Sequence, residues 1–185
     1  KISGILPGQW IALYGAGGLG NLSVQYAKKV FNAQVIAIDI NDDKLALAKE
    51  SGADIIINSA KEDPAARIME ITNGGAHVVV VTAVAKAAFN SAIDSVRAGG
   101  SVIAVALPVD TMDLSIPKTV LDGIKVIGTL VGTRQDLVEA FDLGARGIVV
   151  PVVHSRALED VGDIFQEMQE GKIQGRMVLD FKKTS

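Results

Sequence analysis

The sequence predicts an α/β fold centred on a doubly wound, six-stranded parallel sheet with helices on both faces. Three observations predict it: six short aliphatic runs without polar alternation, longer segments of helical period between them, and capping residues at the junctions. Right-handed crossovers between parallel strands place the intervening helices on both sides of a sheet. With 185 residues, of which 49% are hydrophobic and 21% charged, the chain has the size and composition of a folded domain.

The six predicted strands are runs rich in β-branched and other aliphatic residues. Such continuous runs are typical of parallel strands that are buried on both faces. The runs span residues 10–14, 34–38, 54–57, 78–81, 101–105 and 125–129.

The helices between the strands have recognisable ends. Asn41 is placed to cap the second helix, and Gly52 to end it. Asp63, followed by a proline, predicts the start of the third helix. Thr133 and Asp136 have the spacing of a capping box ahead of the last helix of the sheet.

Two segments depart from this alternation. Residues 107–123 predict a loop with a short edge strand at 114–116. The C-terminal tail predicts a hairpin-like arrangement of a strand at 151–153, a helix, and a half-exposed strand at 176–181. We therefore expect the sheet domain over residues 1–150 and a separate segment over 151–185.

Composition and charge exclude several classes of function. The net charge is −3 and no basic patch stands out, so we expect no nucleic-acid partner. No apolar run approaches a membrane span and no signal peptide is visible, so we expect a cytoplasmic protein with no membrane partner. Cysteine is absent, which excludes disulfides and thiolate zinc sites.

A glycine-rich turn joins the first strand to the first helix. Residues 15–20 fit the pattern G-x-G-x-x-G, in which Gly15 permits the tight turn and Gly17 lets a diphosphate approach the backbone. Gly20 allows close packing of helix and strand. The free amides at Gly18 and Leu19 lie at the positive end of the helix, where an anion binds. The turn predicts a dinucleotide site in a Rossmann domain.

Asp39 indicates which dinucleotide is bound. It closes the second strand nineteen positions after Gly20, where an acidic residue meets the adenosine ribose. A carboxylate there repels a 2′-phosphate, which favours NAD(H) over NADP(H). A simpler interpretation is that Asp39 only caps the next helix, although Asn41 is the better-placed cap. FAD proteins and S-adenosylmethionine methyltransferases also carry such turns, so FAD and S-adenosylmethionine stay open as alternative ligands.

These motifs resemble the coenzyme-binding half of zinc-dependent medium-chain alcohol dehydrogenases, closest to the tetrameric bacterial and yeast type. The resemblance extends from Lys1 to about Phe181. Besides the glycine turn and Asp39, it rests on Pro-Gly-Gln-Trp at 7–10, Ala-Lys at 27–28, Gly-Gly-Ala-His at 74–77, Arg-Ala-Gly-Gly at 97–100 and Val-Gly-Thr-Arg at 131–134.

The resemblance implies that the cofactor is NAD and that the parent enzyme transfers hydride between a small alcohol or aldehyde and NAD. It implies an NAD-binding Rossmann domain at 1–150, and a tail at 151–185 that belongs to a catalytic domain otherwise missing. The family's zinc ligands lie in that domain, whereas here His77 and His154 stand alone in their segments. We therefore expect no catalytic or metal-binding residue in an inactive fragment, with zinc in the parent enzyme only.

The resemblance also implies a set of cofactor contacts. The diphosphate would contact the glycine turn and Arg176, and the adenosine ribose would contact Asp39 and Lys44. The nicotinamide would lie at the ends of the fifth and sixth strands. From spacing alone, plain sheet core is the simpler interpretation of Val105, Leu107 and Val131. An ordinary surface arginine is the simpler interpretation of Arg176 without the family. The expected contacts are Gly15, Gly17, Gly18, Leu19, Gly20, Asp39, Lys44, Ala83, Val105, Leu107, Thr129, Val131 and Arg176.

Two other functions stay open. The chain could be a stand-alone nucleotide-binding module, or a zinc-free quinone or enoyl reductase relative. The reductase interpretation predicts NADPH preference and a basic or small residue in place of Asp39. The resemblance further implies a homo-oligomer joined through a sheet edge near Leu114–Ile116, beside the strand at 125–129. The particular alcohol is not encoded in these residues.

Overall fold

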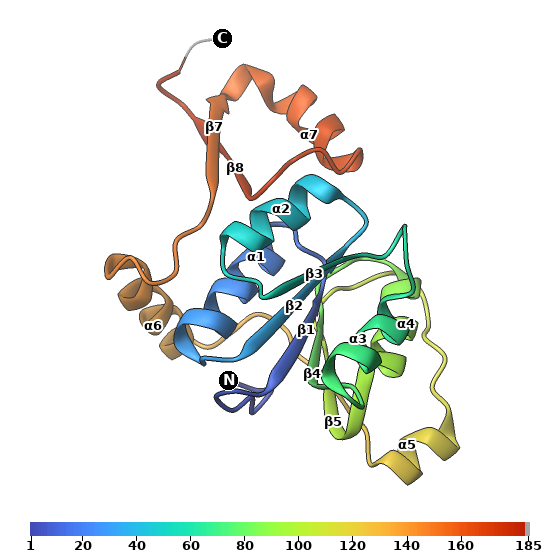
Figure 1. Ribbon diagram of the computed structural model, residues 1–185. Helices are drawn as coiled ribbons and strands as arrows, with labels where there is room; N and C mark the ends of the chain where they lie inside the picture. Colours follow the sequence, from blue (N-terminus) through green and yellow to red (C-terminus); the bar gives the residue numbers. More distant parts are fainter. Residues whose placement is uncertain (184–185) are drawn as a thin grey trace.

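The computed structural model describes residues 1–183 and confirms the six-stranded parallel sheet (Figure 1). The strands lie in the order β3-β2-β1-β4-β5-β6, so the chain runs outward to β3 and then crosses to the other side of β1. Such a reversal of strand order opens a crevice at the carboxyl ends of the strands. The strands are β1 (Trp10–Tyr14), β2 (Gln34–Asp39), β3 (Ile55–Asn58), β4 (Ala76–Val81), β5 (Val96–Ala104) and β6 (Lys125–Gly128).

Helices cover both faces of the sheet, as the alternation predicts. They are α1 (Gly18–Gln25) with a π-helical turn η1 (Tyr26–Val30), α2 (Asp42–Glu50), α3 (Pro64–Thr72), α4 (Lys86–Ser95), α5 (Ile116–Asp122) and α6 (Arg134–Ala145). On one face, Val24 of α1 and Ala48 of α2 are buried against the sheet. On the other face, Ile68 of α3 and Phe89 of α4 are buried.

The predicted helix caps are present. The Asn41 side chain accepts from the N–H groups of the first turn of α2, and Asp63 does the same for α3. Thr133 and Asp136 form the reciprocal capping box of α6. Each cap satisfies amides that have no partner within the helix.

The predicted edge strand at 114–116 is wrong, because a helix begins there. The Ser115 hydroxyl accepts from the Lys118 N–H over 3.3 Å, and Pro117 lies in the first turn of α5. Proline lacks the N–H that a strand ladder needs but fits the first turn of a helix. The sheet therefore ends at β6.

The prediction of a hairpin-like tail is also wrong. The tail contains β7 (Val153–Ala157), a 3-10 turn η2 (Leu158–Asp160), α7 (Val161–Gln169) and β8 (Arg176–Asp180), and the two strands pair in parallel. The tail is thus a small βαβ unit, whose first strand begins at Val153 instead of residue 151. Alternating exposure identifies a strand but not the direction of its partner, and the helix supplies the crossover that parallel pairing needs.

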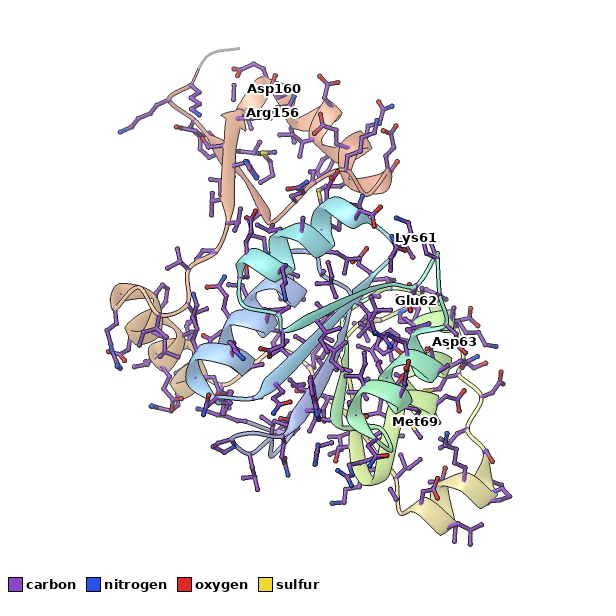
Figure 2. All side chains as sticks on the ribbon, viewed as in Figure 1. Lys61, Glu62, Asp63, Met69, Arg156 and Asp160 are labelled. Atoms are coloured by element: carbon purple, nitrogen blue, oxygen red, sulfur yellow. The ribbon has the colours of Figure 1, made fainter. Side chains whose placement is uncertain are left out.

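The tail has its own polar contacts. Arg156 donates to Asp160 at 3.3 Å and to Glu167 at 2.8 Å, which joins β7 to η2 and to the second half of α7. Figure 2 labels Arg156 and Asp160. In Figure 1 the tail lies beyond α2, at the end of the molecule opposite α5. Across residues 1–183, every helix is too short or too polar to cross a bilayer.

Candidate functional site

A cavity of about 760 Å³ opens at the carboxyl ends of β1, β2 and β4, at the reversal of strand order. Most of the predicted contacts line it, although they come from five separate parts of the chain. These residues are Gly15, Gly17, Gly18, Leu19, Gly20, Asp39, Lys44, Ala83 and Arg176. A volume of this size accommodates a small-molecule cofactor.

The three glycines of the motif have different surroundings. Gly15 has a φ of +99°, and a side chain there would lie 2.8 Å from the Ala83 nitrogen. A Cβ at Gly20 would overlap the Gly15 carbonyl oxygen. At Gly17, by contrast, a Cβ would meet nothing within 4 Å. Gly15 and Gly20 are therefore required by packing, whereas Gly17 leaves space on the cavity side.

The first turn of α1 presents free amides to this space. Gly17 occupies the N-cap position and, having no side chain, provides no capping oxygen. No acidic residue lies in the first turn. The amides and the positive end of the helix dipole are therefore available to an anion. A diphosphate is an anion of this kind, and Gly17, Gly18 and Leu19 would form its cradle.

Asp39 lies across from the glycine turn and is bonded to it. Its Oδ2 accepts from the Ala16 N–H at 2.7 Å, and its Oδ1 accepts from the Asn41 N–H at 3.1 Å. The helix-cap interpretation of Asp39 is wrong, because the Asn41 side chain caps α2. Each carboxylate oxygen retains acceptor capacity beyond these bonds.

Two cations complete the cavity. A Cβ at Gly18 would lie 2.8 Å from Nε of Arg176, so the arginine side chain lies directly over the glycine turn. Lys44, in the first turn of α2, has its ammonium group near Gly171, where a Cβ would be 3.7 Å away. Both cations therefore lie between the sheet domain and the tail.

The four residues expected around nicotinamide do not line this cavity. They follow β5 and β6 on the same carboxyl edge of the sheet. The Val105 N–H donates to Val81 at 3.1 Å, and the Thr129 N–H donates to Ala104 at 3.0 Å. Leu107 and Val131 are 77% and 91% exposed, which excludes the simpler interpretation that they belong to the sheet core, whereas Val105 packs against that core.

Several cavity residues were missed by sequence reasoning. The Thr82 hydroxyl lies 3.1 Å from the Tyr14 carbonyl and 3.0 Å from that of Gly15, which joins the end of β4 to the glycine turn. Its position directly after a buried strand was the available signal. Asp63 and Ser91 also line the cavity, and only the packing of α3 and α4 brings them there.

A hydroxyl network at the cavity wall joins β1 to α4. Ser95 donates to the Ser91 carbonyl at 2.7 Å, so Tyr14 donates to Ser95 at 2.5 Å and accepts from the Ser91 hydroxyl at 2.8 Å. Burial raises the pKa of Tyr14 above its usual value, while its hydrogen bonds with Ser91 and Ser95 act in the opposite direction. The phenol therefore stays protonated and holds α4 against β1.

The described residues do not form a metal site. No group of three potential His, Cys, Asp or Glu ligands converges anywhere in residues 1–183. His77 lies at the opposite edge of the sheet, where its Nδ1 faces the Trp10 N–H at 3.2 Å and its Nε2 faces Arg97 at 2.8 Å. Burial and the neighbouring Arg97 lower the pKa of His77.

Comparison with known proteins identifies the family. Residues 18–146 match the family model described as zinc-binding dehydrogenase, which is well over half of the chain. The chain belongs to the zinc-binding dehydrogenase family. The match begins inside the glycine turn and ends after α6.

Solved structures extend the similarity of this zinc-binding dehydrogenase chain into its tail. The alcohol dehydrogenase of Aeropyrum pernix is 29% identical, with a TM-score of 0.90 over 95% of this chain and 51% of that one. Acetophenone reductase of Geotrichum candidum, solved with NAD, is 27% identical, with a TM-score of 0.84 over 100% and 52%. A quinone oxidoreductase of Pseudomonas syringae is 26% identical, with a TM-score of 0.84 over 97% and 58%. The chain therefore spans about half the length of these structures.

Proposed function

We propose that this chain binds NAD(H) in the cavity at the carboxyl ends of β1, β2 and β4. The observation that carries the proposal is the open space at Gly17, bounded by the uncapped first turn of α1 and by the Asp39 carboxylate. When bound, NAD supplies a nicotinamide ring that accepts or delivers a hydride. The similarity to a reductase solved with NAD supports this choice of cofactor.

Each part of the cavity has a role in this proposal. The amides of Gly18 and Leu19 bind the diphosphate, and Arg176 adds a planar cation suited to phosphate oxygens. Asp39 accepts from the ribose hydroxyls while it keeps its bond to Ala16. Lys44 lies on the ribose side as a point charge.

The nicotinamide half lies farther along the same edge in this proposal. Val105, Leu107, Thr129 and Val131 follow β5 and β6, the next two strands beyond β4. A dinucleotide that crosses the reversal of strand order places its two halves on opposite sides of β1. The exposure of Leu107 and Val131 supports their availability for contact with the ring.

In the parent protein, we propose an NAD-dependent alcohol dehydrogenase that converts a small alcohol to its aldehyde or ketone. The described residues do not fit a zinc site, and cysteine is absent from the whole sequence. Zinc ligands in the proposed parent therefore belong to a domain outside this chain, and the isolated chain is inactive. The tail at 151–185 belongs to that domain in this proposal, which accords with its separate two-stranded sheet.

Titration of the chain with NADH tests the proposal. Binding is followed by energy transfer from Trp10, the single tryptophan, and by calorimetry up to about millimolar concentration. We expect saturable binding of NADH, with weaker binding of NADPH. The proposal fails if neither dinucleotide saturates, or if NADPH binds as tightly as NADH.

A quinone reductase parent is the second candidate, favoured by the similarity to the Pseudomonas syringae enzyme. A zinc-free quinone reductase parent would prefer NADPH. The Asp39 carboxylate disfavours this candidate, because it repels the 2′-phosphate of NADPH. Tighter binding of NADPH in the titration above would favour this candidate. A stand-alone nucleotide-binding module would instead be favoured by a start codon just upstream of Lys1.

We also propose a cytoplasmic homo-oligomer that associates through β6. Residues 114–116 form no strand, so β6 alone presents the free ladder at this end of the sheet. Unpaired strand edges promote pairing with another chain. Light scattering that shows a monomer at all concentrations would contradict this assembly.

A further inference from the structure

Gln25, the last residue of α1, makes an unusual contact with the segment that leads to the tail. Its side chain is buried, with 4% exposed. Nε2 donates to the Val150 carbonyl at 2.8 Å, and Oε1 accepts from the Val150 N–H at 2.9 Å. One amide thus pairs with both backbone groups of one residue, as a neighbouring strand would.

The orientation of this amide is fixed by two other side chains. Nε2 also donates to Oδ1 of Asn21 at 3.1 Å, and Lys29 donates to Oε1 at 3.3 Å. Asn21 is itself held by a bond to Ser51 of 2.7 Å. Every bond is satisfied only if nitrogen and oxygen of the amide lie as described. Gln25 is therefore a rigid attachment point.

Val152, two residues after Val150, is bonded to the start of β8. The Val152 carbonyl accepts from the Arg176 N–H at 2.8 Å. The preceding Gly175 has a φ of +65°, and a Cβ there would overlap the Val152 oxygen. The segment after Val150 and the start of β8 are thus in close backbone contact.

Arg176 lies close to the first residue of α1, at the opposite end of the helix from Gln25. A Cβ at Gly18, the first residue of α1, would lie 2.6 Å from the Gly175 oxygen and 2.8 Å from Nε of Arg176. Helix α1 therefore contacts two points: Gln25 bonds the linker, which is residues 146–150 between α6 and the tail, and Gly18 lies against Arg176. A helix is stiff over two turns, so the distance between these points is set by the helix itself.

We propose that Gln25 is a positioning residue that holds Arg176 over the diphosphate cradle by anchoring the linker at Val150. The inference rests on the proposed function, because it assigns Arg176 to a bound dinucleotide. Gln25 lies at the far end of α1 from the cradle and does not line the cavity. It acts only through the linker and β8.

A double-mutant cycle tests the coupling. Gln25→Leu keeps the bulk of the side chain and removes both bonds to Val150, and Arg176→Gln removes the cation. We expect Gln25→Leu to weaken NADH binding about tenfold in the native background, the loss of roughly one charge-assisted contact. With Arg176→Gln already present, we expect less than about a twofold further change. The matched control Gln135→Leu, on the exposed surface of α6, leaves affinity unchanged.

Hydrogen exchange provides a readout that does not depend on NADH. In Gln25→Leu, the amides of Val150 and Arg176 exchange faster than in the native chain, while those of β1 keep their protection. If Gln25→Leu fails to fold, Gln25→Glu replaces it. Its carboxylate retains the acceptor for the Val150 N–H but repels the Val150 carbonyl, so we expect the same changes at smaller size.

The outcomes separate the two proposals. Equal weakening of NADH binding in both backgrounds, or unchanged exchange at Arg176, would overturn the positioning role even if NADH binds well. If the native chain binds no NADH, the proposed function fails, and the anchoring of Arg176 by Gln25 is then decided by exchange alone.

Discussion

The Asp39 carboxylate at the end of β2 accepts a hydrogen bond of 2.7 Å from the backbone N–H of Ala16 in the glycine turn. The same side chain that faces the proposed ribose therefore also ties the end of β2 to the end of β1. A substitution that removes both functions at once cannot distinguish cofactor recognition from loop geometry. This relationship decides how Asp39 is best tested.

Asp39→Asn is the sharper test of cofactor choice. The amide oxygen still accepts from Ala16, whereas the amide NH2 then faces the Asn41 N–H and loses that weaker bond of 3.1 Å, and the negative charge toward the ribose is lost. We expect NADH binding to weaken about tenfold, roughly 1.4 kcal/mol, with a smaller effect on NADPH because repulsion of its 2′-phosphate is relieved. Calorimetry with both cofactors measures the ratio of the NADPH and NADH dissociation constants. An unchanged ratio, with the melting temperature preserved, would argue against Asp39 as the ribose contact.

Two alanine substitutions in the glycine turn have opposite expected effects. Gly20→Ala places a methyl group on the Gly15 carbonyl, so we expect a loss of stability of about 3 kcal/mol or more. Gly17→Ala meets open space, so we expect stability within about 0.5 kcal/mol of the native chain. The methyl group at Gly17 nevertheless occupies the diphosphate space, and NADH binding should weaken at least about tenfold.

Urea denaturation and NADH titration of both variants measure these effects. Native-like NADH affinity in Gly17→Ala would show that the diphosphate does not lie at this turn. Native-like stability in Gly20→Ala would show that α1 and β1 pack less closely than described.

Tyr14→Phe removes the hydroxyl that joins β1 to α4 through Ser91 and Ser95. We expect a loss of about 1–2 kcal/mol, because the buried Ser95 hydroxyl loses the group that donates to it and the half-buried Ser91 hydroxyl loses its acceptor. This corresponds to a melting temperature lower by about 2–8 °C. The control is Tyr26→Phe at the start of η1. Equal melting temperatures for the Tyr14 variant and the native chain would refute the network's contribution.

We expect Asp54 to make a pH-dependent contribution to stability. Burial alone would raise its pKa, but hydrogen bonds from Lys28 at 2.6 Å and from the Val35 N–H at 2.8 Å outweigh it and lower the pKa. A carboxyl whose pKa is lowered by folding stabilises the folded chain above its unfolded value of 3.8. That contribution is lost as the pH falls through the lower folded pKa.

Asp54→Asn tests this contribution. Because both partners are about one third exposed, we expect a loss of only about 1 kcal/mol at pH 7. The difference from the native chain should shrink as the pH falls below about 4 and vanish in stronger acid. Denaturant unfolding across this range measures it, with Glu50→Gln as the exposed carboxylate control. A difference that stays constant with pH would contradict the ionised state of Asp54.

Local patterns were enough to predict the six strands, the helices other than α5, and the glycine turn. Buried parallel strands, the caps at Asn41 and Asp63, and the capping box at Thr133 depend on neighbours within a few residues. The same local rules failed at residues 114–116, where aliphatic composition suggested a strand but Ser115 and Pro117 favour the first turn of a helix.

The sequence by itself determined the glycine turn and the acidic residue opposite it, because both follow from fixed spacing along βαβ units. Tertiary structure decided the rest of the cavity and the tail. Gln25 and Val150 are 125 residues apart, and Arg176 reaches Gly18 only through the folded linker. The parallel pairing of β7 with β8 is likewise invisible to periodicity. Contacts of this kind arise from packing between distant segments, which no local pattern of residues encodes.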